Sequence, residues 1–124
     1  MTETTNADRL RIGPDAVVWV VSTSIEETAL LDPLPEGTVT VDEPADAMDA
    51  VVLFADARER LVSALDEVLP RAGSTPLIWI VRPAHAHLDI DTGSIAALVG
   101  EYGWHPVADV VLDDTWAAVR LAPA

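Results

Sequence analysis

Apolar and polar residues alternate in blocks along the chain, and the blocks have the periods of strands and helices. Nearly continuous apolar runs, rich in β-branched residues, occupy residues 16–21, 50–55 and 77–81. Runs without alternation are typical of strands that are covered on both faces, as in a parallel sheet. We therefore expect a parallel sheet packed between two layers of helices.

Helical periodicity fills the intervals between these runs. The predicted helices cover residues 25–32, 56–71 and 93–102. The inner stripes are Leu61, Leu65, Val68 and Leu69 in the second helix and Ile95, Leu98 and Val99 in the third. Ser24 and Glu27 have the spacing of a capping box at the start of the first helix.

The remaining segments complete an α/β fold. A short strand is expected at residues 38–41, and residues 105–122 contain two strand-like runs joined by Asp113 and Asp114, a pattern that predicts a β-hairpin. The fold class is therefore a three-layer α/β sandwich with a mostly parallel sheet of about five to six strands, closed by a C-terminal antiparallel hairpin. Residues 1–9 are polar and aperiodic, which predicts a disordered tail before a single domain at residues 10–124.

The net charge of the chain limits the classes of binding partner that we expect. The formal net charge is −14, with 21 acidic residues against seven arginines, and the chain has no lysine and no cysteine. An acidic surface repels phosphate backbones and anionic lipid, so we expect neither a nucleic acid nor a membrane as a partner. The absence of cysteine, of a leader-like start and of an apolar segment of about 18 residues predicts a soluble cytoplasmic protein. The partner is an unidentified protein or small molecule, and self-association is left open.

The order of the later elements resembles a known fold. Two buried strands separated by a long helix, then a helix and a terminal hairpin, are similar to the second half of the class I methyltransferase-like Rossmann fold. The resemblance implies a ligand site beyond the carboxyl ends of the parallel strands. The first-strand turn, "VVSTSIEE", lacks the glycine of cofactor-binding members, whereas Asp42 follows the second strand where such folds keep a ribose-binding acid.

A second resemblance covers about 110 residues. The segments "LRIGPDAVVWV", "ADAMDAVVLFADARERLVSALDEVLP", "STPLIWIVRP" and "WAAVRLAP" look like a small actinobacterial family of unknown function. Where that family tends to have a loop with lysine and glycine, this chain has "AHAHLDID". The resemblance implies a fold but no catalytic residue, and we expect no cofactor.

The stretch "RPAHAHLDID" has metal-capable side chains at every second position. It nearly matches the H-x-H-x-D-H signature of metallo-β-lactamase-type hydrolases, which makes His85, His87 and Asp89 candidate metal ligands. A third ligand would have to be a carboxylate, since His105 is expected at the opposite end of the sheet. The competing interpretation is structural, because the same period of two describes an extended link with one buried face that leads into a helix.

The other candidate ligand-binding residues stand at the expected strand ends. They are Ser22 and Thr23 after the first strand, Asp42 after the second, Asp56 after the third and Arg82 after the fourth. Most of these positions also have an explanation that needs no ligand. The hydroxyl groups of Ser22 and Thr23 can cap the next helix, Asp42 can stand at its position by chance, and Arg82 can form an ion pair with a carboxylate. Trp104 is the aromatic residue most suited to an exposed contact.

Two classes of function follow from these patterns. The leading hypothesis is a non-catalytic module that binds a protein or a small ligand at the carboxyl ends of the strands. The alternative is an enzyme, either a degenerate relative of the S-adenosylmethionine-dependent methyltransferases or a weak His/Asp metal-dependent hydrolase.

Overall fold

A computed structural model describes most of the chain, namely residues 5–22, 25–32, 34–43, 47–72, 75–84 and 92–123. Within these ranges the strands form one six-stranded sheet in the order β2-β1-β3-β4-β6-β5. The strands are β1 (Val17–Val21), β2 (Val39–Val41), β3 (Ala50–Phe54), β4 (Leu77–Pro83), β5 (Trp104–Val111) and β6 (Trp116–Pro123).

The sheet is parallel on one side and antiparallel on the other. Strands β1, β2, β3 and β4 are paired in parallel, and β6 lies antiparallel to both β4 and β5. All five residues of β3 are buried, as the continuous apolar run predicts. The predicted sheet with its C-terminal antiparallel hairpin is confirmed.

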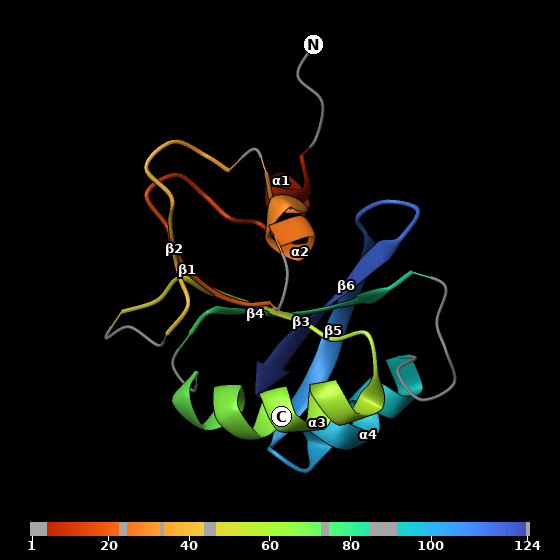
Figure 1. The fold of residues 1–124 in the computed structure, drawn as a ribbon. Helices are drawn as coiled ribbons and strands as arrows, with labels where there is room; N and C mark the ends of the chain where they lie inside the picture. The colour runs from red at the N-terminus through yellow and green to blue at the C-terminus, as the bar shows by residue number, and fades with distance from the viewer. Residues whose placement is uncertain are drawn as a thin grey trace.

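The helices cover both faces of the sheet, which gives three layers (Figure 1). One layer holds α1 (Asn6–Arg9) and α2 (Ile25–Ala29). The opposite layer holds α3 (Arg58–Val68), which the 3-10 turn η1 (Leu69–Arg71) extends, and α4 (Thr92–Gly100). The predicted stripes of the two long helices are buried against the sheet.

Each face of the sheet has its own apolar core. Trp79 and Phe54 belong to the core under α1 and α2, whereas Trp19, Leu61 and Ile95 belong to the core under α3 and α4. Successive residues of a strand point to opposite faces, so one apolar run supplies both cores. Trp104, expected to be exposed, is only 8% exposed and lies in the second core, because β5 begins directly beneath the end of α4.

The structure differs from the predicted tail at residues 5–9. Thr5 caps α1 in a capping box with Asp8, and Ala7 is fully buried. The Trp79 indole donates a 2.9 Å hydrogen bond to the Leu10 carbonyl oxygen just after the helix. A four-residue helix has little stability of its own, so tertiary contacts determine it and local sequence periodicity does not reveal it.

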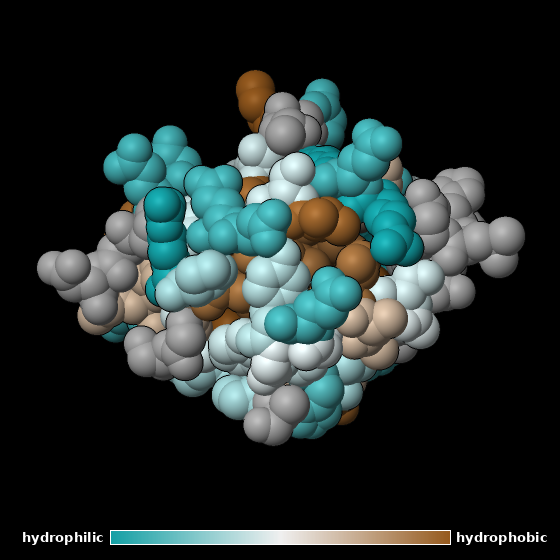
Figure 2. Space-filling model, turned by 90° about the horizontal axis from the view of Figure 1, so that it is seen from below, coloured by the Kyte–Doolittle hydropathy of each residue, from teal (hydrophilic) through white to brown (hydrophobic). Residues whose placement is uncertain are grey.

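Polar side chains cover the outer side of the α3–α4 layer. Figure 2 shows this face, where hydrophilic residues surround a small apolar area. The Tyr102 hydroxyl donates a hydrogen bond to Asp66 of α3, which joins the end of α4 to the neighbouring helix. None of the helices in the described ranges has the length and apolar character that a membrane span requires.

The Trp79→Phe substitution tests how α1 is held. It replaces the indole by a smaller ring and leaves the buried Leu10 carbonyl oxygen without its donor, so we expect the free energy of unfolding to fall by about 2–3 kcal/mol. Urea unfolding measures this change. Trp104→Phe removes the same volume from a site whose indole nitrogen has no partner among the described residues, and it should cost about half as much. Equal losses would contradict a role for the hydrogen bond.

The contact between Tyr102 and Asp66 predicts a pH dependence. The hydrogen bond to Asp66, followed by desolvation and the nearby negative charges, raises the pKa of Tyr102 above its ordinary value of 10.0. The stabilising contribution is therefore present below about pH 10 and is lost as the pH rises through the raised pKa. Ultraviolet titration reports this group alone, because the chain has one tyrosine. Asp66→Ala should lower the midpoint towards 10, and Glu101→Gln should change it less.

Candidate functional site

The direction of the chain connections reverses between β1 and β3. From β1 the chain passes through α2 to β2 on one side, and from β3 it passes through α3 to β4 on the other. The two helices lie on opposite faces of the sheet (Figure 1). In open α/β sheets such a switch point leaves a crevice at the carboxyl ends of the strands, where ligands bind. The candidate site therefore lies around the ends of β1, β2 and β3.

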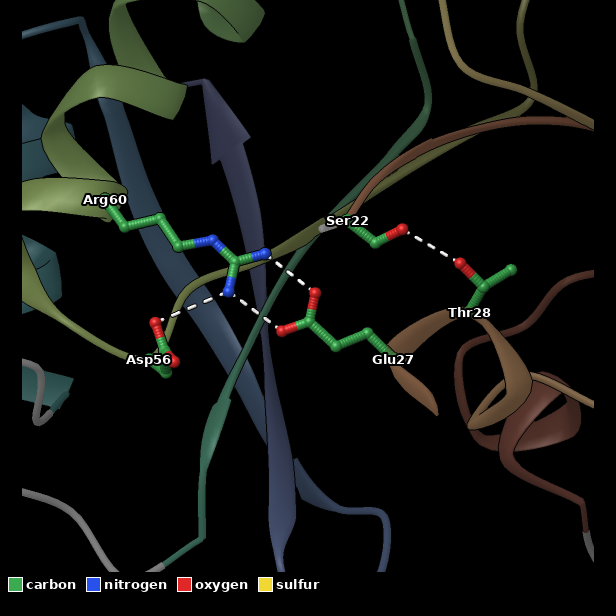
Figure 3. A network of polar contacts seen from close by, with 5 residues as sticks. All are labelled: Ser22, Glu27, Thr28, Asp56 and Arg60. Atoms are coloured by element: carbon green, nitrogen blue, oxygen red, sulfur yellow. Dashed lines mark hydrogen bonds and ion pairs between the residues drawn. The ribbon is translucent and has the colours of Figure 1, made fainter. Parts of the chain in front are cut away.

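A three-residue ionic network crosses this switch point (Figure 3). Arg60 of α3 donates from both terminal nitrogens to the two carboxylate oxygens of Glu27 in α2, each at 2.8 Å. It also donates to Asp56, which follows β3, at 3.4 Å. The ion pair thus connects the two helical layers past the carboxyl ends of β1 and β3.

Burial makes the contact with Glu27 the stronger of the two. The side chains of Glu27 and Arg60 are 9% and 22% exposed, whereas that of Asp56 is 59% exposed. Two-pronged hydrogen bonds between a guanidinium and a carboxylate are strong when water is largely excluded, and exposed pairs contribute little. The hydrogen bond to Glu27 is the largest cause that raises the pKa of Arg60, so the guanidinium stays charged.

A pocket lies beside this network, at the carboxyl ends of β1 and β2. Its volume is about 480 Å³, which falls in the range of about 300–1,000 Å³ that is usual for small-molecule sites. The lining residues are Val20, Ser22, Thr28, Thr40, Val41 and Asp42. The Ser22 and Thr28 hydroxyl oxygens are 2.8 Å apart and share a hydrogen bond, so this wall is held in place by α2 (Figure 3).

The structure brings together some of the predicted residues and separates others. Ser22 and Asp42 line one pocket, and Asp56 belongs to the adjacent ionic network. Arg82 forms a 2.8 Å ion pair with Asp109 of β5, in agreement with the ion-pair interpretation. Asp109 lies on the edge strand, away from the pocket.

The predicted metal ligands lie outside the described residues. His85, His87 and Asp89 all fall in the gaps, as does Thr23, which was a candidate for ligand binding only. The described ranges hold no group of three or more His, Cys, Asp or Glu side chains suited to a metal. His105 lies near the start of β5 and is paired with Ala122, while the carboxyl end of β4 is paired with Trp116. Six residues of strand, about 20 Å, separate those two positions along β6. His105 is therefore at the opposite end of the sheet, as predicted.

Four polar residues of the site were missed by reasoning from sequence. They are Glu27, Thr28, Thr40 and Arg60. The spacing of Asp56 and Arg60 could have indicated their contact, since residues four apart lie on one side of a helix. No local signal joins Glu27 to Arg60, because 33 residues separate them.

Comparisons with known proteins identify the fold. No protein-family model and no curated protein sequence matches the chain. A structure of an S-adenosylmethionine-dependent methyltransferase from Aquifex aeolicus matches 94% of this chain and 87% of its own, with a TM-score of 0.64 and 11% identity. A putative tRNA (m1A22) methyltransferase from Streptococcus pneumoniae matches 99% of this chain and 71% of its own, with a TM-score of 0.60 and 8% identity.

A third match is the O-methyltransferase NcsB1 from neocarzinostatin biosynthesis, in complex with S-adenosylmethionine. It matches 98% of this chain and 52% of its own, with a TM-score of 0.63 and 16% identity. The resemblance to these structures therefore extends over nearly the whole of this chain and is not confined to its later elements. The fold is the Rossmann-like fold of class I methyltransferases.

Substitutions in the ionic network should separate its two contacts. Glu27→Gln leaves the exposed carboxylate of Asp56 as the one charged acceptor of Arg60 among the described residues, so we expect a loss of about 1.5–3 kcal/mol in the free energy of unfolding. Asp56→Asn is the matched control at the exposed end of the same guanidinium, and it should cost less than about 0.5 kcal/mol. Urea unfolding of both variants measures the difference. A larger loss for Asp56→Asn would mean that the exposed contact carries the stability.

Proposed function

We propose that this domain is a non-catalytic module that binds a small molecule at the carboxyl ends of β1 and β2. The observation that carries the proposal is the ion pair between Glu27 and Arg60. The ion pair runs across the switch point between β1 and β3, so it occupies the position where a ligand would extend from one half of such a fold to the other. The pocket next to the ion pair remains, and it has the volume of a small-molecule site.

The turn after β1 also supports binding without methyl transfer. Residues 20–27 contain no glycine, and α2 follows almost at once at Ile25. Glycine in such a turn lets the backbone approach a cofactor closely. In this chain the segment supplies side chains instead, with Ser22 and Thr28 in the pocket wall and Glu27 in the ion pair.

Methyl transfer is the second candidate function, and two observations favour it. The structural neighbours include methyltransferases, one of them in complex with S-adenosylmethionine. Asp42 also lines the pocket just after β2, where related folds keep an acid for ribose hydroxyls. Under this candidate the ion pair would have to open when the cofactor binds.

A titration followed by NMR separates the two functions. We expect no saturable shift with S-adenosylmethionine up to about 1 mM, the upper end of ordinary KM values. A library of small neutral and charged fragments should instead shift the backbone amides of Ser22, Thr40 and Asp42. Saturable binding of S-adenosylmethionine with shifts at Ala55 and Asp56, after β3, would support methyl transfer and contradict the proposal.

Two variants on β2 form the control pair for the pocket. Thr40→Phe places a ring in the pocket and should abolish the shifts that the fragments cause. Val39→Phe changes the preceding residue, which does not line the pocket and is already 52% exposed. Because Val39 is not a lining residue, Val39→Phe should leave fragment binding unchanged.

A further inference from the structure

The pocket lies in a part of the chain that carries only negative charge. Residues 12–57 contain ten acidic residues and no Arg, Lys or His. The acidic residues are Asp15, Glu26, Glu27, Asp32, Glu36, Asp42, Glu43, Asp46, Asp49 and Asp56. All six lining residues lie within this stretch, on β1, β2 and α2 or directly after the two strands.

The chemistry of the lining agrees with this charge distribution. The lining residues include one with a carboxylate, Asp42, three with hydroxyl groups, Ser22, Thr28 and Thr40, and two valines. No basic side chain is among the lining residues that the structure describes. The guanidinium of Arg60 on the neighbouring helix is held by Glu27 and Asp56.

Asp42 has no internal counter-ion in the described part of the chain. No hydrogen bond or ion pair joins its side chain to another described residue, and it is exposed at the pocket. A carboxylate in a concave, negatively charged setting attracts cations and repels anions, and the attraction is strongest at low ionic strength. A phosphate or carboxylate ligand would meet repulsion, and none of the described lining residues carries a positive charge to offset it.

We infer that the pocket takes a hydroxylated organic amine of about the size of an amino sugar. Its ammonium group would pair with the Asp42 carboxylate, and its hydroxyl groups would exchange hydrogen bonds with Ser22, Thr28 and Thr40. The volume of about 480 Å³ accommodates a molecule of that size. The inference rests on the proposed function, because it names the ligand class of the same pocket.

Three sugars that share one ring and carry different charged groups test the ligand class. Glucosamine, glucose and glucosamine 6-phosphate are titrated separately at low salt into the full chain labelled with nitrogen-15, and the amides of Ser22, Thr40 and Asp42 are followed by NMR. We expect glucosamine to bind about tenfold more tightly than glucose, because a hydrogen bond between charged groups replaces a neutral one. Glucosamine 6-phosphate should bind more weakly than glucosamine, and added salt should weaken the binding of glucosamine but not of glucose.

Two variants of equal charge test the role of Asp42. Asp42→Asn keeps the shape of the side chain and should reduce the preference for glucosamine over glucose to less than about twofold. Glu67→Gln removes one negative charge from an exposed position on α3 and should preserve the preference. A preference that survives in Asp42→Asn, or that is lost equally in Glu67→Gln, would overturn the assignment to Asp42.

The outcomes distinguish the inference from the function on which it rests. If glucose or the phosphate ester binds the pocket as tightly as glucosamine, the ligand class is wrong but a binding module remains. If none of the sugars and none of the fragments shifts the pocket amides, both the ligand class and the proposed function are wrong.

Discussion

Burial of the central strands on both faces is the constraint from which the site arises. Strand β3 has no exposed residue, so other elements must cover both of its faces. Helices α1 and α2 lie on one face and α3 and α4 on the other, and the chain reverses direction between β1 and β3. The same arrangement brings polar residues of α2 and α3 together at the carboxyl ends of β1 and β3. Glu27 and Arg60 can meet there because the core is packed from two sides.

The sequence predicts those features that a single segment determines. Continuous apolar runs predicted β1, β3 and β4, and the helical stripes predicted the buried faces of α3 and α4. Features that need two distant segments were not predictable in the same way. The pair of Glu27 and Arg60 spans 33 residues, and α1 forms because Ala7 and Leu10 dock on the sheet. Trp104 looked exposed because burial beneath α4 depends on packing and not on local pattern.

The fold and the chemistry of the site give different kinds of information. The fold is shared with methyltransferases, and one fold supports many activities, so the likeness alone assigns none. The polar groups at the strand ends are specific to this chain. A closed ion pair at the switch point stands next to an acidic, hydroxyl-lined pocket, and together they define which ligands the domain can accept.

The docking of α1 also constrains the order in which the chain can fold during synthesis. The Arg9 guanidinium donates to the carbonyl oxygen of Leu112, 103 residues later, and Trp79 donates to the carbonyl oxygen of Leu10. Helix α1 therefore lacks part of its binding surface until β4, β5 and β6 have been translated. Contacts of such large sequence separation slow folding, and the α1 side of the sheet stays uncovered in the nascent chain. An acidic chain with few cations is suited to that interval, because mutual repulsion keeps unfinished copies apart.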